Sequence, residues 1–191
     1  MPPYTPPHDL RSWHQRDLSV LWHPCTQMAE HPDTLPLIPI RSGKGVWLHD
    51  IEGKRYLDAV SSWWTNLFGH SEPRIAQAIA DQAMKLEHVM FAGFSHEPGL
   101  ELAEKLVAIS PEGLCRVFYA DNGSAAVEVA LKMSFHSHAN QGNPGKTRFI
   151  ALRNSYHGET LGALSMADIP LYRQVYSPLL LEALFAPSPD Y

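Results

Sequence analysis

Tyr119-Ala-Asp-Asn-Gly-Ser-Ala-Ala-Val-Glu-Val-Ala-Leu-Lys132 is the stretch that decides the fold class of this chain. Residues 116–120 predict a short buried strand, and residues 121–124 predict a sharp turn. Residues 125 to about 136 then predict a helix, whose apolar side carries Val127, Leu131 and Phe135. A strand that turns through Gly and Ser into a helix presents free backbone N–H groups where the helix begins.

This turn has the properties of a phosphate-binding site. The helix dipole places roughly half a positive charge at the helix start, which favours an anion. Gly123 lets the backbone approach a ligand closely, and the hydroxyl of Ser124 can donate one more hydrogen bond. The alternative is an ordinary helix start, with Asn122 or Ser124 as the N-cap.

A second turn follows the next expected strand, residues 147–152. Asn154-Ser-Tyr-His-Gly158 predicts a turn into a short helix that ends near Met166. Open α/β sheets bind ligands at the C-terminal ends of their strands, where both turns lie. Tyr156 could stack on a planar heterocycle and His157 could support it, or Tyr156 could be a core residue and His157 a simple turn residue.

The remaining chain shows the alternation of helix and strand that is typical of an α/β domain with a mostly parallel sheet. Residues 1–35 predict an extended arm with one short helix, and residues 45–60 predict a β-hairpin. Helices are expected to begin at Pro73 and near Pro98. Only about two sheet strands are expected after residue 70, fewer than a stable sheet needs.

Composition excludes several classes of protein. The chain has 191 residues and a net charge of -5 with scattered basic residues, which argues against a nucleic-acid surface. No apolar run approaches the roughly 20 residues needed to span a bilayer, and the N-terminus does not have the pattern of a signal peptide. Two cysteines indicate a reducing compartment. The 11 histidines lack the spacing of a metal site.

Three segments together resemble the class III (fold type I) pyridoxal-phosphate aminotransferases. They are Gly53-Lys-Arg-Tyr-Leu-Asp58, Asn122-Gly-Ser-Ala-Ala-Val-Glu128 and Tyr156-His-Gly158. The resemblance implies an α/β fold in two parts. Residues 1–60 would form the N-terminal arm and β-hairpin of the small domain, and residues 61–191 would form the first part of the large cofactor-binding domain.

Four other segments narrow the resemblance to the adenosylmethionine–8-amino-7-oxononanoate aminotransferases of biotin synthesis. They are Leu21-Trp-His-Pro-Cys-Thr-Gln-Met28, Val60-Ser-Ser-Trp-Trp64, His88-Val-Met-Phe-Ala-Gly93 and Leu184-Phe-Ala-Pro187. This family implies a cytoplasmic homodimer. It would transfer the amino group of S-adenosylmethionine to 8-amino-7-oxononanoate, giving 7,8-diaminononanoate, through pyridoxal 5'-phosphate.

The resemblance also implies a cofactor site. Gly123 and Ser124, with Asn122 beside them, would hold the cofactor phosphate. Tyr156 would stack against the pyridine ring and border the substrate site, and His157 would lie beside it.

The substrate site implied by the resemblance has Trp63 in its wall, with Trp64 as its neighbour. Adjacent loop residues point apart, so at most one of the two is expected to face a ligand, and a tryptophan can also simply fill a core. Some members of the family carry at position 25 a tyrosine that contacts the adenine ring of the donor. Cys25 of this chain cannot stack in that way.

The family requires a lysine that forms a Schiff base with the cofactor. It lies well downstream of the Tyr-His-Gly turn in the family, whereas all lysines of this chain precede that turn: 44, 54, 85, 105, 132 and 146. The expectation is therefore an N-terminal part of an aminotransferase that is inactive alone. Two alternatives stay open, another class III ω-amino acid or diamine aminotransferase and a non-catalytic binding module.

Overall fold

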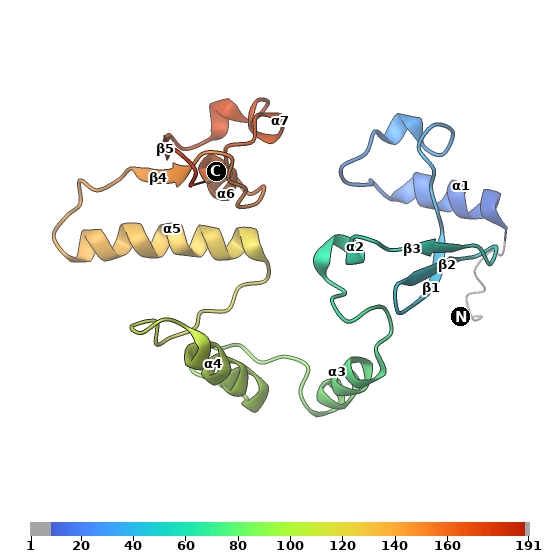
Figure 1. The fold of residues 1–191 in the computed structure, drawn as a ribbon, viewed down its shortest axis with the longest axis horizontal. Helices are drawn as coiled ribbons and strands as arrows, with labels where there is room; N and C mark the ends of the chain where they lie inside the picture. Colours follow the sequence, from blue (N-terminus) through green and yellow to red (C-terminus); the bar gives the residue numbers. More distant parts are fainter. Residues whose placement is uncertain (1–8, 190–191) are drawn as a thin grey trace. The chain divides into compact units, whose positions relative to one another are not determined.

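The computed structural model describes residues 9–189 and divides the chain into two compact units, Met1–Ser95 and His96–Tyr191 (Figure 1). The first residues of the expected N-terminal arm, 1–8, lie outside the described part. The domain boundary expected at residue 60 stays a prediction. Within residues 9–189, no helix combines the length and the apolar character that crossing a membrane would need.

The first unit begins with α1 (Leu10–Val20), the short helix predicted in the arm. The Asp9 carboxylate accepts a hydrogen bond of 2.8 Å from the Ser12 N–H, which satisfies a free donor at the helix start. His14 Nε2 lies 2.8 Å from the Leu37 carbonyl oxygen and so ties α1 to the segment before the sheet. A short 3-10 helix, η1 (Met28–Glu30), lies between them in sequence.

The sheet of this unit is antiparallel, in the order β1 (Ile40–Lys44), β2 (Trp47–Asp50), β3 (Arg55–Leu57). The predicted hairpin is confirmed as β2 and β3, and β1 is an addition. Asp50 is buried, and its carboxylate closes the turn by accepting hydrogen bonds from the Lys54 N–H (2.8 Å) and the Tyr56 hydroxyl (3.0 Å).

Two helical segments follow the sheet. The first, α2 (Ser61–Trp64), lies in the segment predicted to be a loop, and its backbone is left-handed. The second, α3 (Pro73–Lys85), begins at the predicted proline, and Glu72 caps it by accepting the Arg74 N–H at 3.1 Å. Ile75 and Ile79 of this helix are 44% and 64% exposed.

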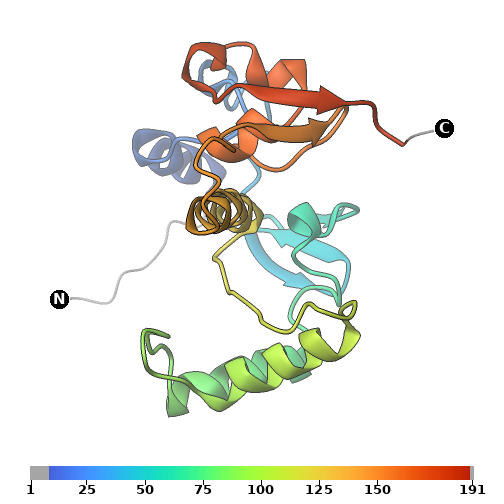
Figure 2. The same cartoon turned by 90° about the vertical axis from the view of Figure 1, so that its left-hand side faces the viewer.

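The second unit combines helices with a two-stranded parallel sheet. Its strands β4 and β5 pair from Phe149↔Ala183 to Leu152↔Ala186, and Figures 1 and 2 show α5 running beside this pair. The α/β class with parallel strands is therefore confirmed. The elements are α4 (Glu97–Ile109), α5 (Gly123–Asn140), β4 (Phe149–Leu152), α6 (Leu161–Met166), α7 (Pro170–Arg173), η2 (Ser177–Leu179) and β5 (Ala183–Ala186).

The buried strand predicted at residues 116–120 is wrong. This segment is not a strand, and Phe118 is 64% exposed. A strand needs a partner for its backbone hydrogen bonds, and among residues 9–189 the only partner of β4 is β5. Strand β5 was not predicted, because its sequence has no clear period.

The core of the second unit lies around α6. Ala163 and Leu164 are 0% and 2% exposed, and Ala151 of β4 is buried with them. The predicted apolar side of α5 is only partly covered, because Val127 and Leu131 are half-buried and Phe135 is 45% exposed. Packing thus concentrates on α6, the helix that follows the second predicted turn.

Candidate functional site

The turn before α5 leaves two backbone donors open. The side chain of Asn122 accepts the Ala125 N–H at 2.9 Å, so Asn122 is the N-cap, one of the two residues considered. The Ala126 N–H donates to the Asn122 carbonyl oxygen at 3.0 Å. In the described part of the chain, no acceptor bonds the N–H groups of Gly123 and Ser124. Two donors therefore remain at the positive end of an 18-residue helix.

The second predicted turn packs directly on the first. Gly158 is buried with a φ of +116°, and a Cβ added to it would lie 1.9 Å from Ser124 Oγ. Only glycine can adopt this backbone and leave room for that hydroxyl. A Cβ on Gly123, by contrast, would meet nothing within 4 Å, so its side of the turn is open. The fold therefore brings together the two turns that the sequence predicted separately.

Tyr156 and His157 lie on the second turn and face outward. The ring of Tyr156 is 52% exposed and tilts at 59° to the ring of Tyr172, with 5.9 Å between centroids. Its hydroxyl donates to Glu159 Oε1 at 3.2 Å. His157 is exposed. Within the described residues, the Tyr156 ring is therefore not part of a core and is accessible to a ligand.

Glu128 connects α5 to the start of α6, and sequence reasoning missed it. Its Oε1 accepts hydrogen bonds from the Thr160 hydroxyl (2.6 Å) and from the N–H groups of Gly162 (2.7 Å) and Ala163 (3.3 Å). The pKa of Glu128 is lowered, and the hydrogen bond from the Thr160 hydroxyl is the largest cause. Burial raises this pKa, but the Thr160 bond, the two N–H groups and Lys132 all lower it and together outweigh burial. Glu128 thus fixes the helix after the second turn to the helix after the first.

The end of β4 is also held in place. The Ser155 hydroxyl donates to the Leu152 carbonyl oxygen at 2.6 Å, and the Asp168 N–H donates to the Ser155 carbonyl oxygen at 2.8 Å. Asn154 has a φ of +61° and donates its N–H to the Asp168 carboxylate at 3.2 Å. Ser155, the residue before Tyr156, is therefore held by hydrogen bonds at both its hydroxyl and its carbonyl oxygen.

The expected substrate-site residues lie in the first unit. Trp63 and Trp64 are 61% and 82% exposed, so neither fills a core within the described residues. They are carried by the left-handed turn α2, and the hydrogen bond between His70 and Asp58 (2.8 Å) holds the segment around that turn. Cys25 is exposed, with a φ of +58°, in the loop after α1.

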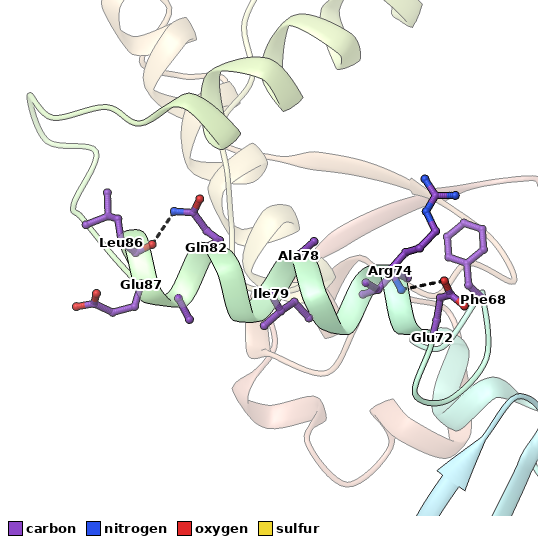
Figure 3. A pocket seen from close by; sticks show the side chains of 10 residues that line it. Phe68, Glu72, Arg74, Ala78, Ile79, Gln82, Leu86 and Glu87 are labelled. Atoms are coloured by element: carbon purple, nitrogen blue, oxygen red, sulfur yellow. Dashed lines mark hydrogen bonds between the residues drawn. The ribbon is translucent and has the colours of Figure 1, made fainter.

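A groove of about 850 Å³ runs along α3 in the first unit. Figure 3 shows Phe68, Ala78 and Ile79 along it, with Glu72 and Gln82 held in hydrogen bonds to their own helix ends. None of the expected site residues lines it. No cluster of three or more metal-ligating side chains occurs within residues 9–189.

The two turns fit the phosphate end of pyridoxal phosphate. Two N–H donors and the Ser124 hydroxyl are present at a helix start, and Gly123 leaves the approach open. An exposed aromatic ring, Tyr156, stands two residues before the glycine that contacts Ser124. This is the donor set and the stacking surface that a phosphorylated heterocycle requires.

Comparison with known proteins agrees with this geometry. Residues 28–191 match the aminotransferase class III family, and the chain belongs to that family, whose cofactor is pyridoxal phosphate. It is 49% identical over 174 residues to the adenosylmethionine-8-amino-7-oxononanoate aminotransferase of Helicobacter pylori and 46% identical over 180 residues to that of Geobacter sulfurreducens. These alignments cover 91% and 94% of this chain and 39% of each relative. The resemblance predicted from the sequence is thus confirmed.

Solved structures give the same result for the fold. The crystal structure of adenosylmethionine-8-amino-7-oxononanoate aminotransferase from Methanocaldococcus jannaschii superposes with a TM-score of 0.88 at 42% identity, over 95% of this chain and 41% of that one. The omega transaminase from Pseudomonas jessenii in complex with PMP superposes with a TM-score of 0.84 at 30% identity, over 93% and 39% of the two chains. The chain therefore spans about two fifths of the length of these proteins.

Proposed function

We propose that this chain provides the phosphate-binding turn and part of the wall of the substrate site of an aminotransferase that uses pyridoxal 5'-phosphate. The observation that carries the proposal is the contact between the two turns. The free N–H groups of Gly123 and Ser124 lie at the turn on which Gly158 packs, and Gly158 follows Tyr156 and His157. These residues would bind the phosphate and cover one face of the ring.

The cofactor, when bound, would supply the electron sink for amino-group transfer. The residues of this chain would orient it. Gly123 and Ser124 would hold the phosphate dianion through two N–H groups and one hydroxyl, in the field of the α5 dipole. Tyr156 would restrict rotation of the ring, and its hydrogen bond to Glu159 would fix the phenol. Glu128 would keep the two turns in register through its bonds to α6.

The substrates we propose are S-adenosylmethionine as amino donor and 8-amino-7-oxononanoate as acceptor, with 7,8-diaminononanoate as product. The names of the relatives support this choice, together with the Trp63-Trp64 pair. Trp63 and Trp64 would contact the substrates through their exposed rings. Cys25 stands where some members of the family carry a tyrosine that contacts the adenine ring. Because its thiol cannot stack on adenine, other groups of the protein would hold the donor. A homodimer and a cytoplasmic location belong to the same proposal.

A second function within the family is the transfer of amino groups from ω-amino acids or diamines. It is favoured by the omega transaminases among the solved structures, with TM-scores of 0.84 at about 30% identity. The departure at Cys25 also fits this alternative, since a weaker grip on adenine would allow other donors.

The test uses the product of the longest open reading frame that contains codons 1–191, called here the full-frame protein. We expect it to form 7,8-diaminononanoate from 8-amino-7-oxononanoate with S-adenosylmethionine as donor, measured by mass spectrometry. Turnover with β-alanine or putrescine but none with S-adenosylmethionine would establish the alternative instead. The 191-residue chain alone should give no product, and any turnover by it would contradict the proposed need for a lysine outside this sequence.

A further inference from the structure

The most strained backbone in the described residues is the turn that carries the two tryptophans. Ser61, Ser62, Trp63 and Trp64 have φ values of 49°, 48°, 60° and 66° in succession. Left-handed conformations are unfavourable for all residues except glycine. Where other residues adopt them, they do so singly and not in runs. Such strain persists only where the surroundings hold it, and it concentrates at functional sites.

The Asp58 carboxylate holds the start of this turn. Its Oδ1 accepts the Ser62 N–H at 2.9 Å, and its Oδ2 accepts the Ser62 hydroxyl at 2.7 Å. The same Oδ2 accepts His70 Nε2–H at 2.8 Å. The side chains of Asp58 and His70 are 6% and 15% exposed, so water competes little with these bonds. One carboxylate thus joins the strained residue Ser62 to a histidine 12 positions from Asp58.

His70 is itself fixed to the β1–β2 turn. Its N–H and carbonyl oxygen pair with Gly45 at 2.7 and 3.0 Å, and a Cβ on Gly43 would lie 2.7 Å from its side chain. The Asp58 N–H donates to the Val46 carbonyl oxygen at 2.9 Å. Both ends of the segment 58–70 are therefore anchored to the β1–β2 turn, and the hydrogen bond between the Asp58 and His70 side chains closes the segment. This pair of side chains is called the clamp below.

The exposed tryptophans depend on this clamp for their direction. Trp63 and Trp64 are 61% and 82% exposed, so packing within the described residues does little to fix their rings. Their backbone is fixed at positive φ, because the Trp64 N–H donates to the Val60 carbonyl oxygen at 2.9 Å and the Asn66 N–H to that of Ser61 at 3.1 Å. If the turn relaxed to ordinary φ values, both indoles would point elsewhere.

We propose that Asp58 and His70 are positioning residues that hold the left-handed turn and thereby direct Trp63 toward the substrate. The part played by Trp63 rests on the proposed function, whereas the holding of the turn does not. The carboxylate acts through Ser62 and His70 and has no contact with the substrate. Its effect is to keep a ring in place that has little packing of its own.

The first test is a double-mutant cycle in the full-frame protein with Asp58→Asn and Trp63→Ala. An amide oxygen can still accept the Ser62 N–H, but the –NH₂ group that replaces Oδ2 can accept neither the Ser62 hydroxyl nor the His70 N–H. We expect Asp58→Asn to lower kcat/KM for the acceptor about 10- to 100-fold, the scale of a misplaced contact. We expect the affinity for pyridoxal phosphate to stay within about twofold, since the cofactor contacts are elsewhere.

The cycle separates positioning from general destabilisation. In the Trp63→Ala background, Asp58→Asn should lower kcat/KM for the acceptor by less than about a further twofold, because the ring that Asp58 directs is gone. Losses that multiply in the double variant would overturn the proposal. Asp81→Asn is the matched control, because it alters an exposed carboxylate that accepts one hydrogen bond, from Gln77 at 2.7 Å. Ser62→Ala, which removes only the 2.7 Å hydroxyl bond, gives a milder change if Asp58→Asn folds poorly.

The second test needs no activity. Crystal structures of the full-frame Asp58→Asn and His70→Asn variants should show residues 61–64 leaving positive φ while β1–β3 keep their register. Retention of the left-handed turn in both variants would overturn the proposal. If the parent protein turns over neither substrate, the proposed function fails, but these φ values still decide whether the clamp holds the turn.

Discussion

Removal of the Glu128 carboxylate should loosen the start of α6, and the structure sets the size of the effect. A single oxygen accepts three hydrogen bonds, from the Thr160 hydroxyl and the N–H groups of Gly162 and Ala163. Each such bond contributes about 1 kcal/mol net. Glu128 is only partly buried, so solvent screening reduces the sum to about 2 kcal/mol. Glu128→Ala should therefore speed hydrogen exchange of the Gly162 N–H about 30-fold.

The conservative variant distinguishes the hydrogen bonds from the charge. Glu128→Gln keeps a carbonyl oxygen where all three donors point, so it loses only the charge assistance, about 0.5–1 kcal/mol. Exchange at Gly162 should rise only about threefold. Glu104→Ala, a change at an exposed carboxylate of α4, is the control and should leave this exchange unchanged. Equal exchange rates in Glu128→Ala and the parent protein would refute the reasoning.

Three further outcomes follow from the same geometry. Hydrogen bonds from Thr160 and the α6 N–H groups lower the pKa of Glu128 in the folded protein below 4.5. The stabilisation of α6 by this carboxylate is therefore complete above pH 4.5 and is lost as the pH falls through the folded pKa. Hydrogen exchange at Gly162, measured against pH, should show this loss in the parent protein and not in Glu128→Gln. Gly158→Ala should weaken pyridoxal phosphate binding at least about tenfold, since its Cβ would meet Ser124 Oγ, while Gly142→Ala, also at positive φ but with nothing within 4 Å, should not. Ser124→Ala should weaken the same binding about tenfold or more through loss of one charge-assisted hydrogen bond, measured by fluorescence titration.

Local signals predicted where α3 and α5 begin and where the turn between β4 and α6 lies. Pro73 starts α3, Asn122 caps α5, and the glycine at 158 separates β4 from α6. These features depend on residues within a few positions of one another, so a sequence window contains them. The proximity of the two turns was expected from the rule that strand ends of an α/β sheet share an edge, although among the described residues only the second turn follows a strand.

Features that depend on distant partners could not be predicted in the same way. Residues 116–120 have strand composition but lack a neighbouring strand in the described residues, whereas residues 183–186 have little period yet pair with β4. Glu128 finds Thr160 at a separation of 32 residues, with no local motif to indicate it. The left-handed turn was unexpected because neither serine nor tryptophan favours positive φ, and the clamp that imposes it closes across 12 residues.

The central claim is that the turn at residues 122–124 binds the cofactor phosphate and that Tyr156 covers the ring. A crystal structure of the full-frame protein soaked with pyridoxal phosphate tests it most directly. The claim predicts phosphate oxygens at about 2.7–3.2 Å from the N–H groups of Gly123 and Ser124, with the pyridine ring stacked on Tyr156. A phosphate bound at another place, with both N–H groups turned to solvent or to protein acceptors, would contradict it.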